Sequence, residues 1–164
     1  MTATVLDEAL TLLSQFLAPD EEIVLAILAA AGKTLGEDDD WRRTLTSTLR
    51  PRPEDYARVF LGEASQRARE GYESFWSAEP ILEVRREHAE VRAAAALAGQ
   101  LHDEAVAYEF PGGYREIVDQ LVPDRWWLTW QFVAPGAPHG VQYDGLVRLD
   151  DHFAWFPKPW RVLG

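Results

Sequence analysis

The chain has 164 residues, no cysteine, and 16 basic against 27 acidic residues, which give a formal net charge of −11. A chain of this length can bury a core without cross-links, so we expect one domain over residues 1–164. The missing cysteines exclude disulfides, thiolate metal sites and a cysteine nucleophile, and the acidic balance argues against nucleic-acid binding, which depends on Lys and Arg.

The N-terminal end of the chain predicts neither secretion nor a membrane anchor. Met1-Thr2-Ala3-Thr4 lacks the basic region and long apolar run of a signal peptide. The longest strongly apolar stretch, residues 23–31, is much shorter than the roughly 20 residues that a membrane helix needs. We therefore expect a cytoplasmic protein without a membrane-spanning segment.

Helical periodicity dominates the front half of the chain. Apolar residues at helical spacing predict helices over residues 5–17 and 20–32 and a third near Trp41. The extended segment Arg50-Pro51-Arg52-Pro53 is followed by the clearest helical pattern, which runs from Tyr56 to Trp76. The acidic run before the third helix is expected to form a solvated loop and consists of Glu37, Asp38, Asp39 and Asp40.

The middle of the chain allows more than one interpretation. Residues 81–85 fit a short strand, whereas residues 88–101 fit a helix through Val91, Ala95, Ala98 and Leu101. The alternation of Val106, Tyr108 and Phe110 predicts a strand that ends at Pro111-Gly112-Gly113. Residues 114–121 then predict a short helix.

The final segment changes from a period of 3.6 residues to a period of two. Residues 126–133, 141–149 and 152–156 therefore predict three antiparallel strands, and the prolines at 157 and 159 take the chain out of the sheet, with Trp160 as an anchor. The expected fold class is α+β, with a helical N-terminal half packed on a C-terminal antiparallel β-meander. A cone-shaped, curved sheet is one form of this arrangement.

No cofactor or metal motif is present in the sequence. Gly32-Lys33-Thr34 is not a phosphate-binding loop, because the glycine that this motif needs at position 27 is Ile. The chain also lacks the G-x-G-x-x-G, G-x-S-x-G and H-E-x-x-H patterns. The spacing of the four histidines, at 88, 102, 139 and 152, indicates no convergence on one ion, so we expect neither a cofactor nor a metal.

Four segments resemble an uncharacterised bacterial group of α+β proteins with cystatin-like or nuclear-transport-factor-like architecture. They are Arg50-Pro51-Arg52-Pro53-Glu54-Asp55-Tyr56, the helix ending at Phe75-Trp76, Phe110-Pro111-Gly112-Gly113-Tyr114, and Phe156-Pro157-Lys158-Pro159-Trp160-Arg161. The resemblance covers about residues 41–164 and implies a sheet that wraps a helix to form a cone. It implies no catalytic residue.

The leading functional hypothesis rests on uneven charge. Residues 1–40 hold nine acids and one base, whereas residues 125–164 hold three acids and four bases. Acidic N-terminal helices suit a basic partner surface, so we predict a non-catalytic binding or accessory protein, of the immunity type, that contacts a protein partner. The predicted contact residues are Glu37, Asp38, Asp39, Asp40 and Trp127.

Trp127 belongs to this set because adjacent strand residues point to opposite faces of a sheet. Of Trp126 and Trp127, one must face away from the core that the other joins, where helices, a partner or a second copy in a homo-oligomer would cover it.

The alternative hypothesis is a small-ligand-binding site, or a hydrolase or isomerase site, in the mouth of the curved sheet. Its polar candidates are His139, Tyr143, Asp144, His152 and Glu109. A deep apolar cavity on which two or more of these side chains converge would favour this alternative.

Overall fold

The computed structural model describes residues 43, 46–47, 49–81, 90–134, 136–138, 140–150 and 152–164. Outside these residues lie the helices predicted over 5–17 and 20–32, almost all of the alternative strand 81–85, the acidic run at 37–40, and the histidines at 88 and 139. The helix predicted near Trp41 is described only at residues 43, 46 and 47, which are helical. The described part combines helices with an antiparallel sheet, as the α+β prediction requires.

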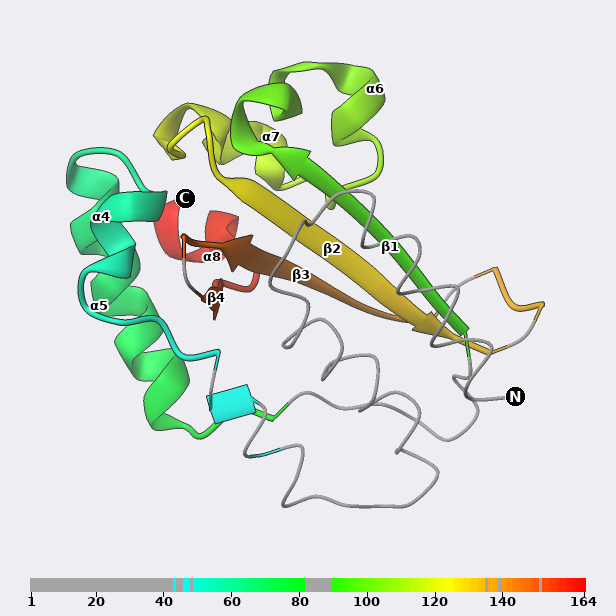
Figure 1. The fold of residues 1–164 in the computed structure, drawn as a ribbon, viewed down its shortest axis with the longest axis horizontal. Coiled ribbons are helices and arrows are strands. Elements are labelled where there is room, and N and C mark those ends of the chain that lie inside the picture. The colour runs from blue at the N-terminus through cyan, green and yellow to red at the C-terminus, as the bar shows by residue number, and fades with distance from the viewer. Residues whose placement is uncertain are drawn as a thin grey trace.

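Four antiparallel strands form the sheet, in the order β1-β2-β3-β4 (Figure 1). They are β1 (Glu90–Leu97), β2 (Trp126–Val133), β3 (Val141–Arg148) and β4 (Phe153–Trp155). The last three are the predicted meander, because period-two alternation with turn residues between the runs specifies consecutive antiparallel strands. The sheet is open, with β1 at one edge and β4 at the other.

The helix predicted over residues 88–101 is wrong, because residues 90–97 form β1. Ala93, Ala94, Ala95 and Ala96 lie opposite Trp130, Thr129, Leu128 and Trp127 of β2. Alanine favours helices locally, but small side chains leave room for these large neighbours on the adjoining strand. Pairing with β2 therefore outweighs the intrinsic preference.

The long helix predicted from Tyr56 to Trp76 is present as two helices, α4 (Asp55–Val59) and α5 (Glu63–Ser77). The break lies at Phe60, which forms an isolated bridge with Leu121, and at Gly62, whose φ of 52° suits glycine. The interruption buries the Phe60 ring, which is 1% exposed, in the core.

Short helices connect β1 to β2, where a strand was predicted at residues 106–110. The connection contains η2 (Ala98–His102), α6 (Glu104–Ala107), α7 (Tyr114–Ile117) and η3 (Val118–Gln120). Asp103 starts α6, because its side chain accepts a hydrogen bond from the backbone N–H of Ala105 at 2.9 Å. This cap overrides the weak three-residue alternation of Val106, Tyr108 and Phe110.

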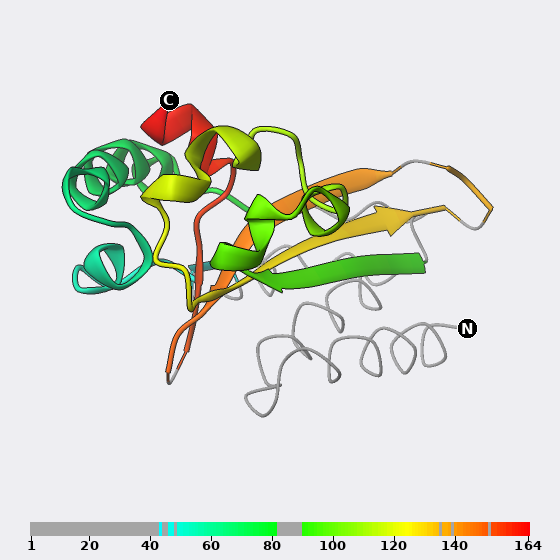
Figure 2. The same cartoon turned by 90° about the horizontal axis from the view of Figure 1, so that it is seen from above.

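The helices α4, α5, α7 and α8 (Pro159–Leu163) gather at the end of the sheet away from the β2–β3 connection (Figures 1 and 2). Helix α8 packs on both α5 and α7. Its Trp160 ring stacks edge-on against Tyr114, with centroids 5.3 Å apart, which supports the predicted anchoring role.

The structure corrects the prediction that Trp127 faces a partner. Its side chain is 0% exposed and contacts the rings of Phe60, Tyr114 and Phe156. The protein's own α4, α7 and C-terminal segment therefore cover this face of the sheet. Thr129, on the same strand, is also buried.

No helix in the described ranges has both the length and the apolar character needed to cross a bilayer.

Candidate functional site

The main candidate site is a pocket of about 330 Å³ beside the free part of β3, called here the β3 pocket. In the strand ladder, β4 pairs only with Leu146, Val147 and Arg148, so residues 141–145 have no backbone pairing with β4. Beyond Trp155 the chain turns away through Pro157, which has no N–H to donate to a ladder. The lining consists of Tyr72, Phe75, Gln142, Tyr143, Asp144, Trp155, Pro157, Lys158, Arg161 and Val162.

Aromatic side chains from two elements form the apolar wall of the β3 pocket. Phe75 on α5 and Trp155 on β4 meet edge to face, with centroids 5.5 Å apart. Trp155 also contacts Tyr143 on β3, at 6.1 Å. The hydroxyl of Tyr72 donates to the carbonyl of Pro157 at 2.9 Å and so ties α5 to the segment after β4. These contacts hold the wall in place without a ligand.

Asp144 is the buried polar group of the β3 pocket, at 3% exposure. Its Oδ2 accepts hydrogen bonds from the Tyr114 hydroxyl at 2.6 Å and from the backbone N–H of Lys158 at 3.0 Å. Its main-chain carbonyl accepts from Nε1 of Trp155 at 2.8 Å. Asp144 therefore joins β3, α7 and the chain that enters α8.

Burial is the largest influence on the pKa values of Asp144 and of Tyr114. It raises the pKa of Asp144, while the hydrogen bonds from Tyr114 and the Lys158 backbone, and then the charges of Lys158 and Arg161, oppose that rise in part. Burial, reinforced by the nearby Asp144 carboxyl, also raises the pKa of Tyr114 well above its usual value. Tyr114 therefore remains a protonated donor.

The raised pKa of Asp144 predicts a specific dependence of stability on pH. The folded state binds the Asp144 proton more tightly than the unfolded state, whose Asp pKa is about 3.9. The contribution of this group to stability is thus fully present below that pH and is lost as pH rises through the folded-state pKa. Relative to Asp144→Asn, which keeps an acceptor oxygen, the wild type is expected to lose free energy of unfolding over this window. Urea denaturation of both proteins between pH 3 and pH 8 measures the difference, and a constant or increasing difference would contradict the prediction.

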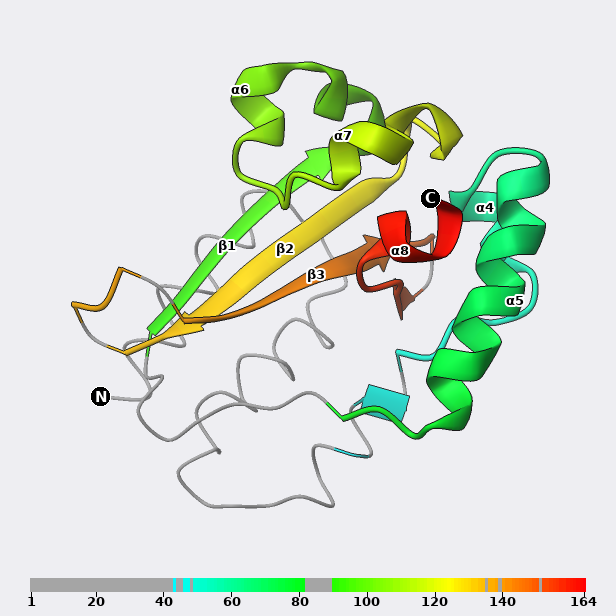
Figure 3. The ribbon, with the colours of Figure 1, turned by 180° about the vertical axis from the view of Figure 1, so that it is seen from behind.

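Two exposed basic residues, Lys158 and Arg161, line the β3 pocket and are called here the cationic rim. Lys158 precedes α8 in a left-handed conformation, with φ of 48° and ψ of 57°, and Arg161 follows three residues later on α8. Both residues are exposed. Figure 3 shows α8 between α5 and α7, beside the end of β3.

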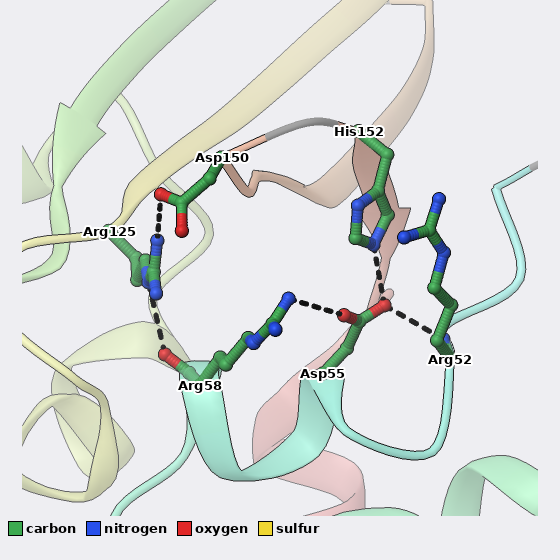
Figure 4. Close-up of polar contacts among 6 residues, drawn as sticks. All are labelled: Arg52, Asp55, Arg58, Arg125, Asp150 and His152. Atoms are coloured by element: carbon green, nitrogen blue, oxygen red, sulfur yellow. Dashed lines mark hydrogen bonds and ion pairs between the residues drawn. The ribbon is translucent and has the colours of Figure 1, made fainter.

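A second polar cluster surrounds Asp55, which is 0% exposed (Figure 4). Nε2 of His152 lies 2.8 Å from Asp55 Oδ2, and the backbone N–H of Arg52 donates to the same oxygen at 2.7 Å. Nη1 of Arg58 lies 3.9 Å from Oδ1, which is an ion-pair distance but too long for a hydrogen bond. The cluster fastens the start of α4 to the entrance of β4.

Arg125 extends the same side of the molecule. Its Nη1 lies 3.0 Å from Oδ1 of Asp150, and its Nε donates to the carbonyl of Arg58 at 3.2 Å.

The contact between Asp55 and His152 resembles the arrangement at a general base, in which a carboxylate orients an imidazole. However, His152 lines neither the β3 pocket nor a second hollow of about 340 Å³ formed by Arg43, Ser47, Arg50, Trp76, Glu79 and Pro80. The arrangement acts as a structural tie.

The structure separates the residues predicted for a site in the sheet. Tyr143 and Asp144 both line the β3 pocket. His152 instead pairs with Asp55, and Glu109 is exposed after α6 and takes no part in the lining. His139 and the partner-contact residues Glu37, Asp38, Asp39 and Asp40 lie outside the described residues.

Sequence reasoning missed most of the residues that build the pocket. Tyr72 and Phe75 appeared as core residues of a helix, and no local pattern connects Tyr114 with Asp144, which is 30 residues away. One feature of the sequence pointed to these residues: residues 125–164 hold more basic than acidic residues, although the whole chain is strongly acidic. Lys158 and Arg161 supply two of the four bases in residues 125–164.

Comparison of the chain with protein families, with curated proteins and with solved structures gave no match. Among the described residues, no group of three or more His, Asp or Glu side chains could hold a metal ion.

Proposed function

We propose that this chain is a small-ligand-binding domain and that the ligand occupies the β3 pocket. The observation that carries the proposal is the composition of the pocket, in which an aromatic wall faces a few polar groups. Small-molecule sites are typically apolar clefts of about 300–1,000 Å³ with a small number of polar side chains that fix orientation. The volume of about 330 Å³ lies at the lower end of this range and suits a compact ligand.

The aromatic wall of the β3 pocket is held in place by the protein's own contacts, which supports the proposal. Phe75 and Trp155 are held by contacts with each other and with neighbouring rings. The hydrogen bond from Tyr72 to Pro157 holds α5 against the segment after β4. A preformed site loses little conformational entropy when it binds a ligand. The convergence of Tyr143 and Asp144 on the pocket favours this function over contact with a protein partner through residues 37–40, which lie outside the described residues.

We also propose a cytoplasmic location, because a chain without cysteine gives no sign of an oxidising compartment. The proposal assigns binding and no chemical step.

A variant that fills the β3 pocket tests the proposal. Gln142 lines the pocket with an exposed side chain, so Gln142→Phe is expected to occupy the space without displacing core atoms. Ligand-observed NMR with bicyclic aromatic compounds identifies binders of the wild type, and titration calorimetry gives their Kd. We expect Gln142→Phe to raise the Kd at least about tenfold, which corresponds to about 1.4 kcal/mol.

The matched control is Gln131→Phe. Gln131 is paired with Gln142 across β2 and β3 but does not line the pocket, so its replacement should leave the Kd unchanged. Binders that respond equally to both variants, or to neither, would contradict binding in the β3 pocket.

A further inference from the structure

We propose that the ligand of the β3 pocket is an organic anion, whose apolar body lies on the wall of Phe75 and Trp155 and whose charged head lies between Lys158 and Arg161. This inference rests on the proposed function and names its ligand class. A compact aromatic carboxylate is the simplest molecule with both parts.

The first argument comes from the cationic rim. Three of the other basic side chains in the described part of the chain, Arg58, Arg69 and Arg125, each lie within 4.0 Å of a carboxylate. Among the described residues, no acidic side chain forms an ion pair with Lys158 or Arg161. Two cations thus stand together at a pocket of a chain whose net charge is −11. An anionic ligand would form the ion pairs that these two side chains do not make with the described residues.

The second argument concerns Asp144, the acid in the lining. Its Oδ2 is already engaged by the Tyr114 hydroxyl and the Lys158 backbone, and its side chain is buried. These contacts hold Asp144 within the protein, whereas Lys158 and Arg161 are exposed and accessible to a ligand.

The third argument separates an organic anion from an inorganic one. Phosphate or sulfate would satisfy the rim but leave the aromatic wall in contact with water. A ligand with an apolar body buries that wall, and a carboxylate head accepts hydrogen bonds from an ammonium or a guanidinium group. Gln142 on β3 belongs to the same lining, and its side-chain amide donates to the Thr129 hydroxyl at 3.3 Å.

The experiment compares two probes of nearly equal shape. 2-Naphthoate carries the charge, and 2-naphthamide has the same ring system without it. Calorimetry on the full chain at low and at moderate ionic strength gives the Kd of each probe. We expect the naphthoate to bind at least tenfold more tightly than the amide, with a difference that shrinks as salt screens the rim.

Variants of the rim assign the effect to residues. Lys158→Gln and Arg161→Gln are each expected to weaken naphthoate binding about threefold to tenfold, and the double variant should bind both probes equally. Amide binding should change little in all three. Arg115→Gln is the control, because it removes the same charge from an exposed position on α7 outside the pocket. Circular dichroism and thermal unfolding verify that each variant is folded.

The outcomes distinguish the two proposals. Equal binding of both probes to the wild type, unchanged in the rim variants, would overturn the anionic ligand class and leave the pocket as a neutral-ligand site. A loss of naphthoate binding in Arg115→Gln equal to that in Arg161→Gln would overturn it as well, since only net charge would then matter. Failure of the wild type to bind either probe, together with no binder in the aromatic set, would overturn the proposed function itself.

Discussion

Replacement of Gly145 by alanine is expected to lower the free energy of unfolding by about 3–5 kcal/mol, from backbone strain and overpacking together. Gly145 has a φ of 86°, and a Cβ at this position would overlap the carbonyl of Phe156 and lie 2.9 Å from Cα of Pro157. These obstacles are main-chain atoms and cannot move aside as a flexible side chain can. Phe156 N–H also donates to the Gly145 carbonyl at 2.7 Å, which holds the two segments close.

The position of Gly145 explains why its loss would also affect the site. The register between β2 and β3 shifts between Leu128 and Thr129, so that Thr129 pairs with Asp144 and Leu128 with Leu146. Gly145 is the extra residue of this bulge. A substitution there would displace Asp144 from Tyr114 and from the entry to α8.

Urea denaturation of Gly145→Ala and Gly112→Ala measures this prediction. Gly112 is the matched control, because no atom lies within 4 Å of its Cβ position and its φ is not in the left-handed range. The control should be neutral or more stable by up to about 1 kcal/mol. Equal midpoints for the two variants would show that the bulge does not constrain residue 145.

Replacement of Trp127 by alanine is expected to destabilise the fold by about 3–5 kcal/mol, the usual cost of removing a large buried aromatic side chain. Trp127 is 0% exposed, and its ring lies edge-on to Phe60 at 6.1 Å and to Tyr114 at 5.6 Å. These contacts connect β2 to the end of α4 and to α7. The cavity left by alanine would separate three elements at once.

Trp126 provides the comparison within the same strand. It is only partly buried, so Trp126→Ala should cost less than half as much as Trp127→Ala. Thermal or chemical denaturation of both variants, with solution mass measured in parallel, tests this order. If Trp127→Ala instead keeps its stability and changes the oligomeric state, the tryptophan serves an interface and the burial described above is not its main role.

The sequence by itself determined the elements whose pattern is local and complete. Strand β2 follows from its period-two alternation, and β3 and β4 follow from short strand-like runs separated by turn residues. The helical stretch of α5 follows from apolar spacing around charged positions. Tyr143 and Asp144 could be selected as candidates because they are polar groups on a strand that was expected to reach the mouth of the sheet.

Tertiary structure decided the alanine-rich strand β1, the break at Phe60 and the burial of Trp127. Alanine at 93–96 is compatible with either a helix or a strand, and only the large side chains of β2 opposite it select the strand. Either tryptophan of the pair could have faced outward until the helices covered Trp127. The β3 pocket likewise depends on where β4 stops and on which helices pass beside it. Lys158 and Arg161 meet Phe75 there only because α8 packs on α5, a contact between segments far apart in the chain that no local periodicity can encode.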